Sequence, residues 1–175
     1  MVGMLLFLVL LAAVLFSLLI TRYMVTAAGV EDALAASNLA SAVIDLEEYG
    51  RSHTICIPDT EQAFQTFKEA LCCNLKLDSF LNTSNGEVLS APVEIKEYII
   101  YNVRDRMVDI LVLDGEGRLK TQETGIRGNV FTPDNICVET TTIYSRVGYW
   151  VEGFMGQELY AEKEKSIDIT RCDSE

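Results

Sequence analysis

The stretch that decides the fold is MVGMLLFLVLLAAVLFSLLI, residues 1–20, which runs on without a break into TRYMVTAAGVEDALAASNLASAVIDLEEYG, residues 21–50. No charged side chain precedes Arg22. A helix that crosses a bilayer needs about 20 predominantly apolar residues. We therefore expect residues 1–21 to form the membrane-spanning part of one long helix. Residues 22–50 are expected to form its extramembrane, amphipathic part.

The extramembrane part repeats its apolar residues at close to helical spacing, and alanines fill many of the positions between them. The repeating residues are Val30, Leu34, Leu39, Val43 and Leu46. Small residues let neighbouring helices approach closely. This expected helix-packing face suits docking onto the protein's own sheet and packing against copies or partners equally well. Gly50 is expected to end the helix as a C-cap.

Residues 51–175 predict an α+β domain. Asp59, with Gln62 three residues later, is expected to cap a second, short helix that fades near residue 77. After a turn cluster at residues 82–86, the period of the apolar residues changes to two, which indicates strands. The strands are expected at residues 93–103, 107–113, 118–124, 137–147 (continuing at 149–154 past a kink at Gly148) and 159–170. The last is an edge strand, where Lys163 and Lys165 discourage further pairing.

The expected fold class is therefore α+β: a long N-terminal membrane-spanning helix, a short second helix, and then an antiparallel sheet of about four or five strands.

Composition and motifs argue against an enzyme. The net charge of −12 arises entirely at and beyond Arg22, and such an acidic surface repels phosphate, so nucleic acid is not an expected partner. The chain has one histidine, His53, and lacks a G-x-S-x-G, a P-loop and a G-x-G-x-x-G motif. His53 and the nearby cysteines do not have the spacing of a zinc site. We expect no catalytic residue, no cofactor and no metal.

The five cysteines are Cys56, Cys72, Cys73, Cys137 and Cys172, and all of them follow the anchor. In an extracytoplasmic domain they are candidates for disulfides. The alternative is that several of them are small buried hydrophobic residues. The spacing does not define a pairing.

The apolar segment has two interpretations. It is either a retained transmembrane helix or a secretory signal peptide, cleaved near Val25-Thr26-Ala27. The apolar run exceeds the usual signal-peptide core of about 7–15 residues, and no basic residue precedes it, so retention is favoured. Arg22 and Tyr23 are expected to anchor the helix at the membrane interface. Taken alone, Arg22 favours a cytoplasmic C-terminus, but large domains translocate regardless of such charges.

The apolar segment from Met4 to Ile20, its continuation EDALAASNLA at residues 31–40, and the order helix, helix, sheet together resemble the type IV pilin superfamily. More narrowly, the chain looks like the TadE-like pseudopilins of tight-adherence (Flp-type) pilus systems. The likeness covers roughly the first third of the chain in sequence and the rest in architecture. It implies a single-pass protein of the cell membrane with an extracytoplasmic C-terminal domain.

In that family a dedicated peptidase cuts after a small residue, and the matching position here is the bond between Gly3 and Met4. The family commonly carries a glutamate at the fifth mature position. Counted from Met4, that position is Leu8, and no basic residue precedes the cut. The chain departs from the family pattern at both points.

The resemblance implies a minor pilin or pseudopilin that assembles or initiates a pilus or secretion filament through helix bundling. Its partners would be the lipid bilayer, other pilin-like subunits or copies of itself, and the pilus assembly machinery; a subunit of a conjugation or competence apparatus would share this architecture. The alternative is a membrane-tethered or secreted surface domain that binds a partner while its helical stalk stays passive. Four aromatic residues could then form a contact patch, although core packing is the favoured interpretation of them: Tyr98, Tyr144, Tyr149 and Trp150.

Overall fold

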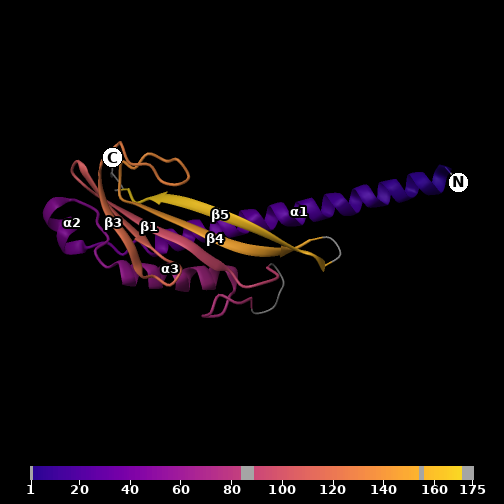
Figure 1. Cartoon of the computed structure of the whole chain (residues 1–175), viewed down its shortest axis with the longest axis horizontal. Coiled ribbons are helices and arrows are strands. Elements are labelled where there is room, and N and C mark those ends of the chain that lie inside the picture. Colours follow the sequence, from indigo (N-terminus) through magenta and orange to yellow (C-terminus); the bar gives the residue numbers. More distant parts are fainter. Residues whose placement is uncertain (1, 84–88, 154–155, 171–175) are drawn as a thin grey trace.

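A computed structural model describes residues 2–83, 89–153 and 156–170. Its helices are α1 (Val2–Ala40), α2 (Leu46–Ser52) and α3 (Thr60–Leu75). Its strands are β1 (Glu94–Arg104), β2 (Met107–Leu113), β3 (Leu119–Ile126), β4 (Thr142–Glu152) and β5 (Glu158–Asp168). The first half of α1 projects as a bare rod from a domain formed by the other elements (Figure 1). The expected α+β architecture is confirmed.

The strands form one antiparallel sheet in the order β3-β2-β1-β4-β5. The central strand β1 places Tyr98 opposite Leu113 of β2 on one side and opposite Ser145 of β4 on the other. Side chains alternate between the faces of a strand, so Tyr98 and Ile100 face one layer and Ile99 faces the opposite one. The strand β5 is an edge, as expected.

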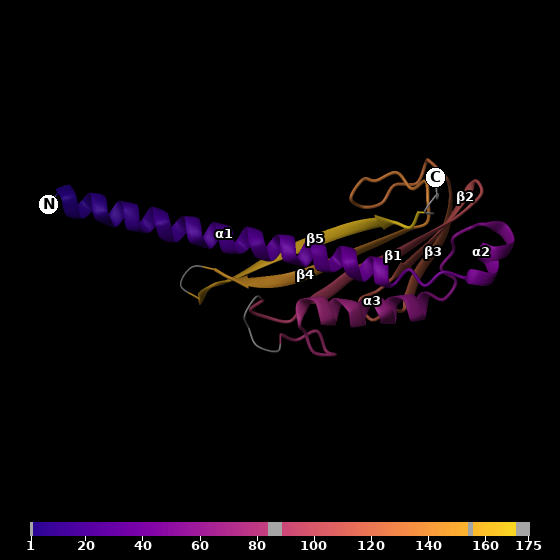
Figure 2. The same cartoon turned by 180° about the vertical axis from the view of Figure 1, so that it is seen from behind.

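The C-terminal half of α1 and the helix α3 lie side by side on one face of the sheet (Figure 2). Asp59 caps α3 as expected, because its carboxylate accepts a hydrogen bond from the Gln62 backbone N–H at 2.8 Å. The rings of Phe67 on α3 and Tyr98 on β1 lie 4.8 Å apart at the centre of the core. Residues from both helices and from the sheet are completely buried there, among them Val30, Leu34, Phe67, Leu71, Tyr98, Ile100 and Ile143.

The segment of residues 127–141 folds over the other face of the sheet. Val138 is buried there with Ile99, Tyr101 and Tyr144. The strand expected from residue 137 therefore begins only at Thr142, because Val138 packs on top of the sheet instead of within it. The expected kink at Gly148 is also absent. β4 runs straight through this glycine, and the Tyr160 side chain occupies the space that a side chain at Gly148 would fill.

Helix α1 ends at Ala40, ten residues before the expected C-cap at Gly50. The Ser41 hydroxyl donates to the Asn38 carbonyl at 2.8 Å and accepts from the buried Tyr98 hydroxyl, also at 2.8 Å. A serine that bonds the preceding turn competes with the continuing helix, and its partner Tyr98 holds it in the core. The chain then turns, and Gly50 lies inside the separate helix α2.

The connector before α3 is fixed by one side chain of β1. The Asn102 carboxamide oxygen accepts from the Ile57 N–H at 2.8 Å, and its amide nitrogen donates to the Ile57 carbonyl at 2.9 Å. Both residues are buried. These two hydrogen bonds give the backbone of Ile57 the partners that a neighbouring strand would otherwise supply, and they position the start of α3.

Replacing Asn102 with alanine leaves the two buried backbone groups of Ile57 without partners. We expect Asn102→Ala to lower the free energy of unfolding by about 2–4 kcal/mol, measured by urea denaturation of the full-length protein in detergent micelles. The matched control is Gln122→Ala on the exposed strand β3, which should change the free energy by about 0.5 kcal/mol at most. Equal losses in both variants would contradict the assignment.

Candidate functional site

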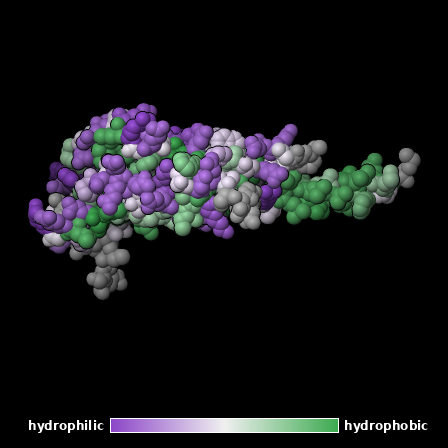
Figure 3. Space-filling model, turned by 90° about the horizontal axis from the view of Figure 1, so that it is seen from below, coloured by the Kyte–Doolittle hydropathy of each residue, from purple (hydrophilic) through white to green (hydrophobic). Residues whose placement is uncertain are grey.

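In the N-terminal part of α1, residues 2–25, no side chain is fully buried and only Leu19 is half-buried. The space-filling view shows it as an almost continuous hydrophobic rod beyond a mostly hydrophilic body (Figure 3). Leu5, Phe7 and Phe16, for example, are each more than 60 % exposed. Within the described residues, α1 is the one helix long and apolar enough to be a candidate membrane span. A surface of this kind requires lipid or protein to cover it.

The exposed and the docked parts of α1 belong to one continuous helix. It remains α-helical from Thr21 to Val30, and Gly29 causes no break. At 1.5 Å per residue, the helix Val2–Ala40 is about 58 Å long. The exposed apolar part, which is the candidate membrane span, and the docked part are therefore joined without a hinge.

One face of the second half of α1 docks onto the protein's own core. Its buried positions repeat at helical spacing: Thr26, Val30, Ala33, Leu34, Ser37 and Asn38. The Asn38 amide donates to the Lys165 carbonyl of the edge strand β5 at 2.9 Å. The polar members of this face were not predicted from the sequence, although they lie at the same helical spacing as Val30 and Leu34.

The expected helix-packing face is thus divided. Val30 and Leu34 are buried in the domain, while Leu39 is 61 % exposed on the opposite side of α1. Val43 lies after the end of α1, and Leu46 is exposed at the start of α2. The continuous stripe expected from Val30 to Leu46 does not exist, because the helix stops at Ala40.

A second face of α1 points away from the domain and stays exposed. It consists of Val25, Ala28, Gly29, Asp32, Ala36 and Leu39. We call these six residues the outer face. Half of these residues, Ala28, Gly29 and Ala36, are small, and the outer face continues directly into the apolar surface of residues 2–25.

Glu31 fastens α1 to the sheet through two lysines of β5. Its carboxylate lies 2.9 Å from the Lys165 ammonium and 3.2 Å from that of Lys163. Hydrogen bonds from Lys165 and then Lys163 hold the pKa of the Glu31 carboxyl below its ordinary value, and Glu31 in turn raises the pKa of Lys165. Beyond their expected role at the sheet edge, these lysines thus hold the helix.

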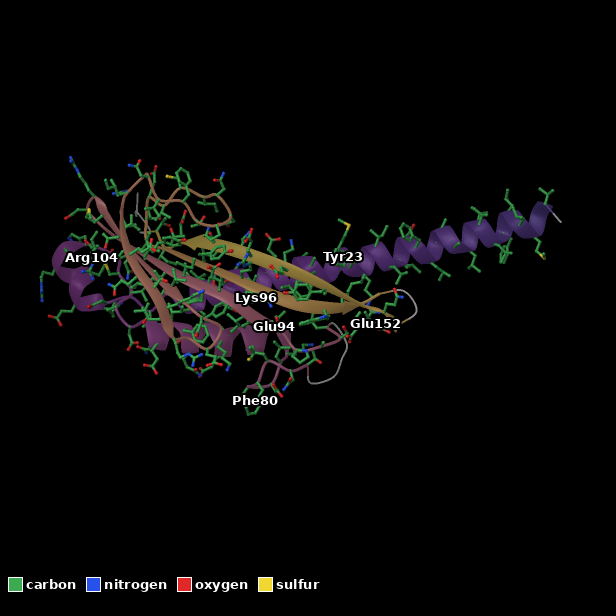
Figure 4. All side chains as sticks on the ribbon, in the orientation of Figure 1. Tyr23, Phe80, Glu94, Lys96, Arg104 and Glu152 are labelled. Atoms are coloured by element: carbon green, nitrogen blue, oxygen red, sulfur yellow. The ribbon has the colours of Figure 1, made fainter. Side chains whose placement is uncertain are left out.

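Both expected interface anchors lie where α1 leaves the domain. The Arg22 guanidinium is 3.4 Å from the Glu152 carboxylate at the end of β4. Tyr23, the next residue, is 41 % exposed beside the same end of the sheet (Figure 4). Arg22 is therefore held at the boundary between the bare and the docked parts of the helix.

The remaining candidates do not converge on one site. Gly3 and Met4 are exposed near the start of α1. Cys56 is buried and accepts a hydrogen bond from the Arg104 guanidinium, whereas Cys73 is exposed. Cys72 and Cys137 are half-buried, and burial raises the pKa of the Cys72 thiol. These four cysteines carry free thiols, and Cys172 lies outside the described residues. No three His, Cys, Asp or Glu residues of the described ranges are grouped so that they could hold a metal ion.

The aromatic contact patch is not formed. Tyr98, Tyr144 and Tyr149 are completely buried, and Trp150 is half-buried against the Tyr160 ring. Burial raises the pKa of Tyr98. These side chains pack in the interior and between strands, which is the interpretation that the sequence analysis favoured.

Comparison with known proteins adds no relative: no protein-family model, no curated protein and no solved structure matches this chain. The function must therefore be inferred from the structure itself, namely from the two faces of α1 and from the end of the sheet that lies against α1.

The two salt bridges of Glu31, with Lys163 and Lys165, which we call the Glu31 clamp, should make a contribution to stability that is lost in acid. The folded state holds the Glu31 pKa below its ordinary value, so the stabilisation is complete above that ordinary value and is lost as the pH falls through the lowered pKa. Because the carboxylate is partly exposed, we expect Glu31→Gln to cost about 0.5–1 kcal/mol at pH 7. The difference from the natural protein should shrink as the pH falls through the lowered pKa and vanish well below it, and urea denaturation along a series of pH values measures it. The control Glu123→Gln on β3 should show no such dependence, and a pH-independent cost of Glu31→Gln would contradict the clamp.

Proposed function

We propose that this protein is a membrane-anchored minor pilin or pseudopilin, and that it acts in the assembly or initiation of a pilus or secretion filament by lateral packing of α1. The observation that carries the proposal is the continuity of α1. A single helix is uncharged and largely exposed from Val2 to Thr21, and from Thr26 it docks onto its own domain along one face while leaving another face exposed.

Lipid would cover residues 2–21 in the membrane. In a filament, neighbouring helices would replace the lipid. Since lipid tails are as apolar as leucine, this exchange gains little from hydrophobicity and depends on close van der Waals packing, which small residues favour. The outer face supplies such residues at Ala28, Gly29 and Ala36, and the space beside Gly29 is open. Packing that begins in the membrane would thus continue along the outer face.

The docked face supports retention of the anchor. Cleavage after Ala27 would remove Thr26, which is buried against the domain, and Arg22, which pairs with Glu152. A passive leader would not need these contacts. The extracytoplasmic position of the C-terminal domain is part of the proposal and follows from the resemblance to pilins.

The outer face predicts crosslinks between chains. In a variant whose five native cysteines are replaced by alanine, Ala36→Cys and Leu39→Cys should each form adducts with a second copy or a partner when cells are treated with a bis-maleimide. Ala33→Cys should form none, because Ala33 is buried against the chain's own core. Gel mobility and mass spectrometry measure the adducts.

Absence of adducts at both outer positions would reject packing as the function. It would leave the alternative of a surface-binding domain on a passive stalk, which removal of residues 1–25 tests directly, since a passive stalk is dispensable for binding. Equal adducts from Ala33→Cys would also contradict the proposal, because they would require α1 to leave its own sheet.

If the protein is processed like a pilin, a peptidase cuts the bond between Gly3 and Met4. The mature chain isolated from cells should begin at Met4, and Gly3→Leu should block the cut, since a bulky residue replaces the small one before the cleaved bond. Gly3 has open space around it, so the substitution leaves the fold intact. N-terminal sequencing measures the result, with Ala12→Leu as a control that should still be cut. A chain beginning at Ala28 would indicate secretion, and an intact Met1 would indicate a simple anchor; either contradicts pilin-type processing.

A further inference from the structure

An apolar groove of about 730 Å³ lies between α1 and the end of the β4–β5 hairpin. Its helix wall extends from Ala12 to Tyr23, and its other wall includes Val151 and Leu159. Figure 4 shows Tyr23 and Glu152 close together at this end of the sheet, while Arg104 lies at the opposite end. The hairpin therefore reaches back along α1 beside residues that precede its first charge.

The position of the groove relative to the membrane follows from the exposed apolar side chains of α1, which water would solvate poorly. On α1, Leu15, Phe16 and Ile20 are 47 %, 65 % and 44 % exposed. If the membrane ended before Ala12, all three would stand in water. If it ends near Arg22, the uncharged segment spans about 27 Å from Met4 or about 31 Å from Met1, which is close to the thickness of the hydrocarbon core of a bilayer, about 30 Å. The helix wall of the groove then lies at the depth of the lipid tails.

The rim of the groove has the chemistry of a membrane interface. Arg22 pairs with Glu152 there, and the guanidinium of a residue at this position reaches toward the headgroups. Two rungs further into the sheet, Trp150 and Tyr160 stack edge to face, with ring centres 4.9 Å apart. Lys96 lies over the Tyr160 ring at 5.6 Å. Tryptophan and tyrosine gather at the headgroup level of membranes.

We propose that the end of the β4–β5 hairpin lies within the membrane interface, and that an acyl chain of a bilayer lipid fills the groove between this hairpin and α1. The proposal rests on the membrane anchorage in the proposed function, but not on bundling. The groove opens among side chains of α1 that face lipid in any case, so a lipid tail is the apolar group already present at this depth.

The single tryptophan of the chain allows a direct test. Trp150→Phe removes it, and one tryptophan is then introduced by Leu159→Trp, Leu10→Trp or Arg106→Trp. Leu159 lines the groove, Leu10 lies in the candidate span, and Arg106 is exposed at the far end of the sheet. Each full-length variant is reconstituted at a low protein-to-lipid ratio in phosphatidylcholine vesicles, with and without bromine on the acyl chains, and its emission is compared. Circular dichroism confirms that each variant is folded.

The proposal requires that bromine quenches the tryptophan introduced at position 159 as well as the one at position 10, and leaves the one at position 106 unquenched. Quenching at position 10 without quenching at position 159 would overturn the proposal but leave the membrane anchor in place. Protein, either a second copy or another segment of the same chain, would then fill the groove instead of lipid. Absence of quenching at position 10 would overturn the anchor and the proposal together.

Discussion

A single unbroken helix joins an exposed apolar half to a half that packs in the core of the domain, and the rest of the structure depends on that constraint. Up to Thr21, α1 carries apolar side chains all round, which suits lipid. From Thr26 onward one face matches the protein's own sheet. The change occurs between Thr21 and Thr26, where the pairing of Arg22 with Glu152 holds the boundary of the two parts against the end of β4. The apolar half of α1 cannot rotate freely relative to the domain, because the other half of the same helix is part of the domain's core.

The docking of α1 also determines which surface remains for partners. Val30 and Leu34 fill the core, Asn38 closes the edge of β5, and Glu31 is clamped by two lysines of the same strand. Every contact of this set lies on one side of the helix. The outer face, half of whose residues are small, continues into the candidate membrane span, so in the proposed function one packing surface would extend along the whole helix. In the proposed function, assembly uses this surface without rearranging the domain.

The fold was largely predictable where a local pattern decides it. Uncharged residues 1–21 and the capped helix at Asp59 were recognised from composition and spacing, and most strands from their period of two. The sequence failed where a distant residue decides the local outcome. Gly50 looked like the end of the helix, but Tyr98, from a strand 57 residues after Ser41, holds the serine that ends it. Val138 has the pattern of a strand residue, yet it covers the sheet. The outer face could not be predicted for the same reason, because a stripe of alanines does not show which side of the helix the domain will cover. The groove beside Leu159 could not be predicted either, because it forms only where the hairpin and the helix meet in the folded protein.

The central claim is that the membrane half and the docked half form one straight helix. Spin labels at Leu10→Cys and Ala36→Cys, in the full-length protein without native cysteines and reconstituted in vesicles, measure this directly through their dipolar coupling. A continuous helix predicts one narrow distance distribution centred near about 39 Å, at 1.5 Å per residue. A broad distribution, or one centred at a clearly shorter distance, would mean that the helix bends or unravels between the two halves and would contradict the account.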